Sequence, residues 1–241
     1  MVPINQQKQK LPTRALRLSF SKTGVLQYIS HLDLQRTMTR AIIRAEIPVW
    51  YTEGFNPKPR LNFSTPLSIG TESHYELMDF RIVVADETMS TPDLSVMRDR
   101  LNATLPPEIN IAEIYEPTTK FSEILYSNYT IRIEEQNIDA LLLENCRAAL
   151  SAKPLFVLKR TKSGEKDTDI SPMIVSLNVS GDHGAIDIRA CLTASSESFL
   201  NPEYLVNALL AKDVLAPVPK SEREYSIMRE DLLDRDLKHF R

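Results

Sequence analysis

Apolar and polar positions along this chain predict an ordered series of strands and helices. Residues 15–20 alternate apolar and polar side chains, as a half-buried strand does. Over residues 31–46 the apolar positions recur every three or four residues, which predicts an amphipathic helix. Ser30, with Asp33 three residues later, is a variant of the capping box that starts such a helix, and Pro48 ends the element. The predicted apolar stripe consists of Leu34, Met38, Ala41, Ile42 and Ala45.

The rest of the chain repeats one plan. In the first half we expect further strands at 49–51, 61–64, 75–84 and 109–115, and a helix at 92–105. In the second half we expect strands at 126–134, 155–160, 173–179, 185–192 and 223–228, and helices at 138–152 and 202–211. The order in the first half is strand, helix, strand, strand, helix, strand, which is the split βαβ or ferredoxin-like unit, and the second half follows a similar order.

The sequence therefore predicts an α+β protein of two tandem ferredoxin-like domains with antiparallel sheets. Residues 117–125 read as a linker, and residues 159–169 form a charged loop between two predicted strands. The predicted organisation is a flexible lead at 1–13, domains at 14–116 and 126–228, and a charged tail with helical potential at 229–241.

Composition narrows the class of protein. The 241 residues are 42% hydrophobic and 25% charged, which is enough apolar material for a core. No stretch approaches the roughly 18 apolar residues of a membrane span, so we expect no membrane partner. Cys146 and Cys191 are too few for a disulfide scaffold or a cysteine-ligated iron–sulfur cluster. The polar N-terminus lacks the apolar core of a secretory signal, so a cytoplasmic location is expected.

Charge is distributed unevenly. Residues 1–60 carry ten Lys or Arg against three Asp or Glu, a balance of +7, whereas the whole chain is −3. Such an asymmetry favours an anionic partner for the first quarter, although basic residues also cover ordinary solvated faces.

Two basic segments stand out in that quarter. Arg36, Arg40 and Arg44 recur every four residues and so fall on one face of the predicted helix, about 6 Å apart, a spacing suited to nucleic-acid phosphates. The loop at 54–60 is stiffened by prolines and combines an aromatic ring with polar and basic groups, as single-stranded RNA sites do. Its candidate binding residues are Phe55, Asn56, Lys58 and Arg60, while Trp50 and Phe63 beside it are expected in the core.

A weaker basic segment lies in the second half. Lys159, Arg160 and Lys162 belong to a stretch, 153–166, with five bases and one acid. This stretch either extends a nucleic-acid surface or is a solvated hairpin.

Candidate catalytic chemistry centres on His31. A histidine at a helix N-terminus has a depressed pKa and suits general acid–base work. Tyr28, Ser30 and Asp33 lie nearby in sequence, but a capping serine beside a histidine is also a common structural feature. The other histidines lack zinc-site spacing, and no phosphate-binding loop or dinucleotide fingerprint is present. No metal or cofactor is therefore expected.

Several of these motifs resemble one family. They are Tyr28-Ile-Ser-His-Leu-Asp-Leu-Gln-Arg36, then Arg40 and Arg44, then Gly54-Phe-Asn-Pro-Lys-Pro59, then Pro66-Leu-Ser-Ile-Gly70 and Glu76. In this pattern the chain resembles the radical-SAM-linked proteins, a bacterial domain of unknown function, over residues 14 to about 220. Lys58 stands where the family more often has histidine, which favours binding over catalysis at that position. The 159–169 stretch resembles the family's basic loop.

The resemblance implies partners rather than a reaction. It implies a radical-SAM protein as a partner and, because such proteins tend to be encoded near ribosome and RNA-processing genes, an RNA such as tRNA or rRNA. The tandem plan is also similar to that of CRISPR-repeat RNA endonucleases, in which a histidine near the first helix cuts RNA without metal. His31 is the matching residue here.

Three functional hypotheses follow. The leading one is a non-catalytic RNA-binding accessory protein that presents RNA to a radical-SAM enzyme. The second is a metal-independent endoribonuclease that uses His31, assisted by Tyr28 or Lys58. The third is a protein-interaction module for a radical-SAM protein, without RNA contact.

Overall fold

A computed structural model of the chain describes residues 12–53, 55–84, 93–135, 137–161, 164–182, 184–215 and 224–241, except for the side chains of Arg160 and Thr161. Within these ranges the protein is a mixed α+β molecule with a large, mainly antiparallel sheet and four α-helices. The helices are α1 (His31–Arg44), α2 (Leu94–Asn102), α3 (Ala140–Leu150) and α4 (Glu203–Ala211).

Ten strands accompany them. The first half of the molecule contains β1 (Thr13–Lys22), β2 (Asn62–Phe63), β3 (Thr71–Val83) and β4 (Ile109–Tyr115). The second half contains β5 (Tyr126–Glu134), β6 (Phe156–Thr161), β7 (Gly164–Asp169), β8 (Ile174–Asp182), β9 (Ala185–Thr193) and β10 (Tyr225–Leu233).

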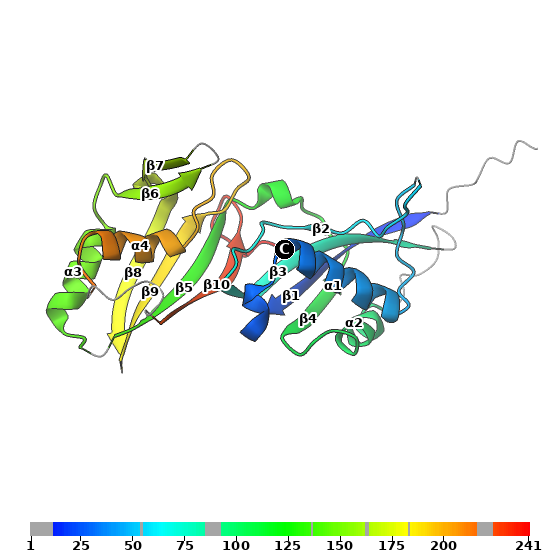
Figure 1. Ribbon diagram of the computed structural model, residues 1–241. Coiled ribbons are helices and arrows are strands. Elements are labelled where there is room, and N and C mark those ends of the chain that lie inside the picture. Colours follow the sequence, from blue (N-terminus) through cyan, green and yellow to red (C-terminus); the bar gives the residue numbers. More distant parts are fainter. Residues whose placement is uncertain are drawn as a thin grey trace, which may run out of the picture.

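One sheet runs through both halves (Figure 1). Its order is β4-β1-β3-β10-β5-β9-β8, and the short β2 pairs with β3. The last strand of the chain, β10, joins the halves because it pairs antiparallel with β5 on one side and parallel with β3 on the other. The parallel contact is short, from Ile227 opposite Thr71 to Arg229 opposite Ser73. We call this junction the seam.

Each half has its own apolar core. In the first, Leu16, Leu18 and Phe20 of β1 pack with Phe80 of β3 and with the buried stripe of α1. In the second, β5 and β9 pack against α3 and α4 through residues such as Ile131, Ile188 and Leu205. Figure 1 shows α1 and α4 in front of the sheet. We call this the helix face and the other side the back face.

Helix α1 follows the predicted pattern closely. The Ser30 side chain accepts a hydrogen bond from the Asp33 backbone N–H, as an N-cap does. Leu34, Met38, Ala41 and Ile42 are buried. The helix ends at Arg44, before Pro48, because Glu46 adopts a left-handed φ of 50°.

The back face of the first half is covered as well, so β1 is buried on both sides rather than half-buried as expected. Its alternate residues Arg17 and Ser19 are buried although they point away from the helices. The cover comes from residues 116–125 and from the C-terminal segment, where Phe240 packs with Leu77, Ile124 and Leu232.

Three elements differ from the sequence prediction. The expected strand at 49–51 forms only isolated bridges, from Val49 to Ile82 and from Tyr51 to Pro59, because the prolines that follow cannot donate to a ladder. The charged loop contains a strand, β7, which forms a hairpin with β6. The last strand extends beyond 228 to Leu233, and residues 234–241 turn back along it without forming a helix.

Candidate nucleic-acid interface

The three arginines of α1 lie on its exposed side. Arg36, Arg40 and Arg44 are all exposed, whereas the residues between them that face the sheet are buried. Arg36 forms an exposed ion pair with Asp33 at 3.2 Å between Nη1 and Oδ1. Arg40 and Arg44 have no acidic partner in the part of the chain that the structure describes. The helix therefore presents a row of cations, two of them unneutralised.

The loop after α1, described at 51–53 and 55–60, lies beyond the C-terminal end of the helix (Figure 1). It is closed by a hydrogen bond from the Thr52 N–H to the Lys58 carbonyl at 3.0 Å and by one from the Lys58 N–H to Thr52 Oγ1 at 3.2 Å. Phe55, Asn56 and Lys58 are exposed, Phe55 completely so. A phenylalanine ring in water is less stable than a covered one, so the exposed Phe55 ring would gain free energy by stacking on a partner.

Arg60 is directed elsewhere. It lines a cavity of about 360 Å³ together with Trp50, Asn62, Asp79 and Arg81. Asp79 pairs with Arg17 and Arg81 with Ala15, so this cavity opens on the back face, opposite α1. The structure therefore does not bring Arg60 together with the α1 arginines.

Two residues of this cavity differ from the sequence prediction. Trp50 is half-buried in the cavity wall rather than part of the core. Arg81 is exposed and was missed as a candidate, because a single arginine in a strand carries no periodic signal. Phe63, by contrast, packs against the core as expected.

Two bases of the positive first quarter are structural. The fully buried Arg17 donates to both carboxylate oxygens of Asp79, at 2.6 and 3.0 Å, and lies 4.2 Å from the ring centroid of Phe121. Lys22 is buried and donates to the carbonyls of Leu26 and Thr71. Burial lowers the pKa of Lys22, and the nearby Glu76 carboxylate opposes this effect. Neither side chain can reach an outside anion.

His31 lies at the start of α1, where its described neighbours include an aromatic ring. Its ring meets Phe63 edge-on, with 5.1 Å between centroids. Within the described residues His31 makes no hydrogen bond or ion pair, while Ser30 and Asp33 bond to each other at 2.6 Å. Tyr28 is 67% exposed. Within the described part of the chain, no side chain is hydrogen-bonded to His31 as the partner in an acid–base pair would be.

The basic residues of the second half lie apart from α1. Lys159 is in the β6–β7 hairpin, with its ammonium group 6.0 Å from the ring centroid of Tyr204 in α4. Figure 1 shows this hairpin above α4, at the opposite end of the sheet from α2. The Arg160 side chain and Lys162 lie outside the described residues.

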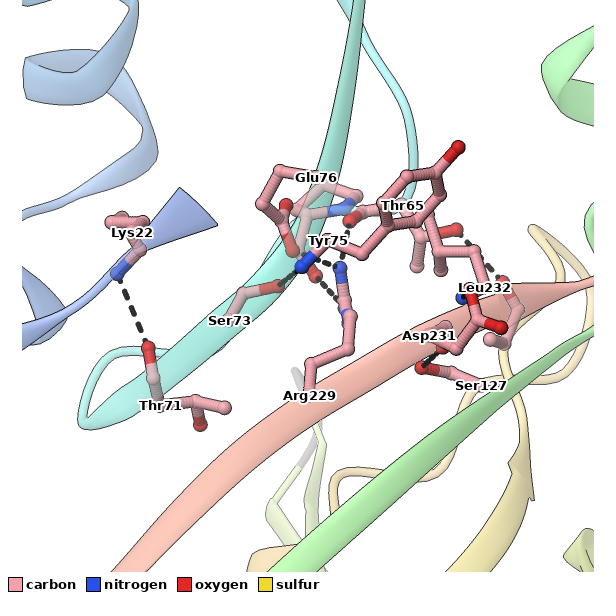
Figure 2. A network of polar contacts seen from close by, with 12 residues as sticks. Lys22, Thr65, Thr71, Ser73, Tyr75, Glu76, Ser127, Arg229, Asp231 and Leu232 are labelled. Atoms are coloured by element: carbon pink, nitrogen blue, oxygen red, sulfur yellow. Dashed lines mark hydrogen bonds and ion pairs between the residues drawn. The ribbon is translucent and has the colours of Figure 1, made fainter. Parts of the chain in front are cut away.

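A buried polar network crosses the seam (Figure 2). Arg229 of β10 donates to Glu76 of β3 at 2.9 Å and to the carbonyl oxygens of Thr65 and Pro66 at 3.0 and 3.3 Å. Burial alone would lower the pKa of Arg229, but Glu76 and Tyr129 raise it overall, so the guanidinium stays charged. This network fixes the segment after β2 against the last strand.

Beside the network, a cleft of about 620 Å³ lies between the halves. Three segments form its walls. They are residues 62–68, which comprise β2 and the turn after it, residues 121–124 before β5, and residues 194–199 after β9. The sequence alone does not reveal this cleft, because these segments are distant in the chain and share no motif.

Most of the chain matches one protein-family model. The model described as an uncharacterized protein conserved in bacteria (DUF2344) matches residues 15–202. The chain belongs to the DUF2344 family. The matched DUF2344 region begins in β1, contains α1 and Glu76, and ends just before α4, so Arg229 lies outside it. No curated protein matches the chain.

Several solved structures resemble this DUF2344 protein weakly. They are an unknown protein from Galdieria sulphuraria (TM-score 0.25, 11% identity, covering 90% of this chain and 99% of that one), a putative glycine cleavage system transcriptional repressor (0.23, 12%, 92% and 99%) and Thermus thermophilus Cse3 bound to an RNA representing a pre-cleavage complex (0.23, 13%, 81% and 90%). At these TM-scores the likenesses carry no argument about function.

Two further observations concern the described residues of the DUF2344 chain. No helix among them is long and apolar enough to cross a membrane. No three of their His, Cys, Asp or Glu side chains gather in a way that could hold a metal ion.

Proposed function

We propose that this DUF2344 protein is a non-catalytic RNA-binding module whose main contact surface is the exposed side of α1. The observation that carries the proposal is the row of Arg36, Arg40 and Arg44, exposed along one helix, with Arg40 and Arg44 unpaired in the described part of the chain. Guanidinium groups one helical turn apart suit successive phosphates, since each donates in a fork that matches phosphate oxygens.

The loop at 51–60 is the second contact in this proposal. Lys58 supplies a further cation and the uncovered Phe55 ring a stacking surface beyond the end of α1. Arg60, with Trp50 and Arg81, lies on the back face of the sheet. It would contact RNA only if the RNA strand passed around the edge of the sheet from α1 to the back face.

The finer fold assignment is part of the proposal. We propose two tandem ferredoxin-like units. The strand orders support it, because β4-β1-β3-β2 in the first half has the same pattern as β10-β5-β9-β8 in the second. The proposed units are those expected from sequence, 14–116 and 126–228, with the second extended to include all of β10.

The proposed partner is a radical-SAM enzyme to which the chain presents tRNA or rRNA in the bacterial cytoplasm. The resemblance of the α1 and loop motifs to radical-SAM-linked proteins supports this step. The chain has a surface for the RNA in α1 and, through the sheet, a rigid frame that holds this surface in one orientation.

A salt titration tests the proposal. Affinity for a single-stranded RNA is measured against ionic strength for the wild type and for the double variant Arg40→Ala/Arg44→Ala. Each lost phosphate contact lowers the slope of log affinity against log salt by about 0.7, so the double variant should be shallower by about 1.4.

The matched control removes the same charge elsewhere. Arg98→Ala/Arg100→Ala deletes two arginines of α2, one half-buried and one exposed, that pair with Asp99 and Glu46, and should leave the slope almost unchanged. A wild-type slope near zero, or equal slopes for the α1 and α2 variants, would refute the proposal. The same RNA is expected to remain intact in EDTA, and cleavage abolished by His31→Ala would instead establish the nuclease hypothesis.

A further inference from the structure

The cleft between the halves has the dimensions of a small-molecule site. Its volume of about 620 Å³ lies within the range of ligand pockets, about 300–1,000 Å³. Three half-buried phenylalanines, Phe63, Phe121 and Phe199, come to it from three separate segments of the chain. Aromatic side chains from both halves of the molecule therefore line one hollow.

The described residues that line the cleft are all neutral. They include the hydroxyl-bearing Ser64, Thr65 and Ser196, and none of the described lining residues carries a charged side chain. A phosphate would gain no cation here, whereas a flat, neutral ring with hydrogen-bonding edges would find both stacking surfaces and hydroxyl partners.

One of these hydroxyls lacks a partner. Ser64 is 7% exposed, and its Oγ atom is buried without a hydrogen bond within the described chain. Buried hydroxyls in folded proteins nearly always have a partner. Because Ser64 belongs to the wall of the cleft, a rotation of its side chain toward the hollow would give this hydroxyl a partner on a ligand.

The walls of the cleft are held rigidly. The Arg229 guanidinium holds the carbonyl oxygens of Thr65 and Pro66 from behind, as Figure 2 shows for Thr65. Thr65 Oγ1 also donates to the Ala194 carbonyl of the second half, at 3.0 Å. A wall tied to both halves needs little ordering when a ligand enters, which favours binding.

One residue of the cleft wall contacts the start of α1. Phe63, which lines the cleft, packs edge-on against the ring of His31, the first residue of the helix. An RNA strand whose phosphates follow Arg44, Arg40 and Arg36 toward His31 would therefore be separated from the cleft wall by one ring contact.

From these observations we infer that the cleft binds a nucleobase, stacked among the three phenylalanines with its edge bonded to the hydroxyls. The base comes either from a free nucleoside or from the RNA strand held on α1, and the second source rests on the proposed function. In either case Arg229 acts as a positioning residue, because it reaches the ligand only through the carbonyls of Thr65 and Pro66.

Calorimetric titration of the full chain with the four common nucleosides tests the inference. Ribose 5-phosphate, which carries sugar and phosphate but no base, serves as the negative ligand. At least one nucleoside should bind saturably and ribose 5-phosphate should not. Phe199→Ala should weaken the affinity for that nucleoside roughly tenfold or more, since the bound base loses an aromatic stacking partner.

A second variant keeps the test decisive if Phe199→Ala does not fold. Ser196 is exposed at the rim of the cleft, so Ser196→Trp fills it without removing a core contact and should abolish nucleoside binding. Phe156→Ala, which removes a 56% exposed phenylalanine from the β6–β7 hairpin, is the matched control and should bind like the wild type.

A short single-stranded RNA distinguishes the two sources of the base. If RNA supplies it, Ser196→Trp weakens RNA binding, while Arg40→Ala/Arg44→Ala weakens RNA but leaves nucleoside binding intact. If only nucleosides respond to Ser196→Trp, the cleft takes a free nucleoside. No saturable nucleoside binding, together with unchanged RNA affinity in Ser196→Trp, overturns the inference and leaves the α1 proposal standing. If the wild type does not bind RNA, the α1 proposal is overturned, and the nucleoside titration alone decides whether the cleft binds a base.

Discussion

Arg229 and Glu76 form a buried ion pair in the middle of the sheet, with 2.9 Å between guanidinium nitrogen and carboxylate oxygen. The side chain of Arg229 is completely buried, and that of Glu76 is 6% exposed. Such a pair is not a strong source of stability by itself, because both charges lose their hydration. What it does is tie β3, β10 and the segment 65–66 into one arrangement.

The first prediction concerns this pair. Arg229→Met should lower the free energy of unfolding by about 3–5 kcal/mol, because the Glu76 carboxylate is left buried without its partner. Glu76→Gln should cost less, since the amide oxygen still accepts a hydrogen bond from Arg229. Urea denaturation of both variants measures the difference. A cost for Arg229→Met that is no larger than that for Glu76→Gln would contradict the assigned geometry.

The second prediction concerns the C-terminal segment. Phe240 is 2% exposed and lies 5.3 Å from the Arg17 guanidinium, measured to its ring centroid. Phe240→Ala should therefore destabilise the chain by about 3–5 kcal/mol, as large-to-small changes of buried phenylalanine do. Leu237→Ala, in the same segment but 48% exposed, is the control and should stay within about 0.5 kcal/mol. Thermal or urea unfolding compares them, and similar costs would show that the segment does not cover the back face.

The third prediction concerns acid. The hydrogen bond from the Ser30 hydroxyl, with help from Arg36, lowers the pKa of Asp33 below its usual range. A carboxylate with a lowered pKa stabilises the folded state above its unfolded pKa, and this contribution disappears as the pH falls through the folded pKa. The stability difference between wild type and Asp33→Asn should thus shrink as the pH falls from about 5 to about 2. If the urea midpoints gave a stability difference that did not change with pH, the hydrogen bond between Ser30 and the Asp33 carboxylate would be contradicted.

The fourth prediction concerns the thiols. Cys146 and Cys191 are buried, and burial raises the pKa of both. Because the thiolate is the reactive form, iodoacetamide at about pH 8 should label neither cysteine in the folded chain and both after denaturation. Mass spectrometry of the two samples reads this out. Rapid labelling of Cys191 in the native protein would mean that its strand opens to solvent.

Much of the local structure followed from the pattern of side chains. The stripe of Leu34, Met38, Ala41 and Ile42 is buried as predicted, because a 3.6-residue period leaves a helix only one face for its apolar residues. Strand β4 was predicted with its observed bounds, since Ile109, Ile111 and Ile114 mark its buried face. Strand β7 was missed because its sequence, Gly-Glu-Lys-Asp-Thr-Asp, has no apolar alternation and is paired only by its backbone.

The long-range polar contacts were beyond such reasoning. In the sequence, Arg17 is only one of the ten bases of residues 1–60, and Arg229 is the first residue of the predicted charged tail. Their carboxylate partners lie 62 and 153 residues away in the sequence, so no local spacing reveals them. The separation of Arg60 from the α1 arginines also depends on the assembled sheet. The alternation of side chains along the strands places Arg60, with Asn62 and Arg81, on the back face of that sheet.

The place of β10 has a consequence for how the chain is made. This strand is synthesised long after β5 and β3, yet it lies between them in the sheet and pairs with most of β5. During synthesis β5 therefore waits with one unpaired edge, a state in which strands of neighbouring nascent chains can join. Closing a contact between Thr71 and Ile227 also spans most of the chain, which slows folding. The two parts of the sheet can join only after β10 has been made, so the exposed edge of β5 persists while all the residues between the two strands are synthesised.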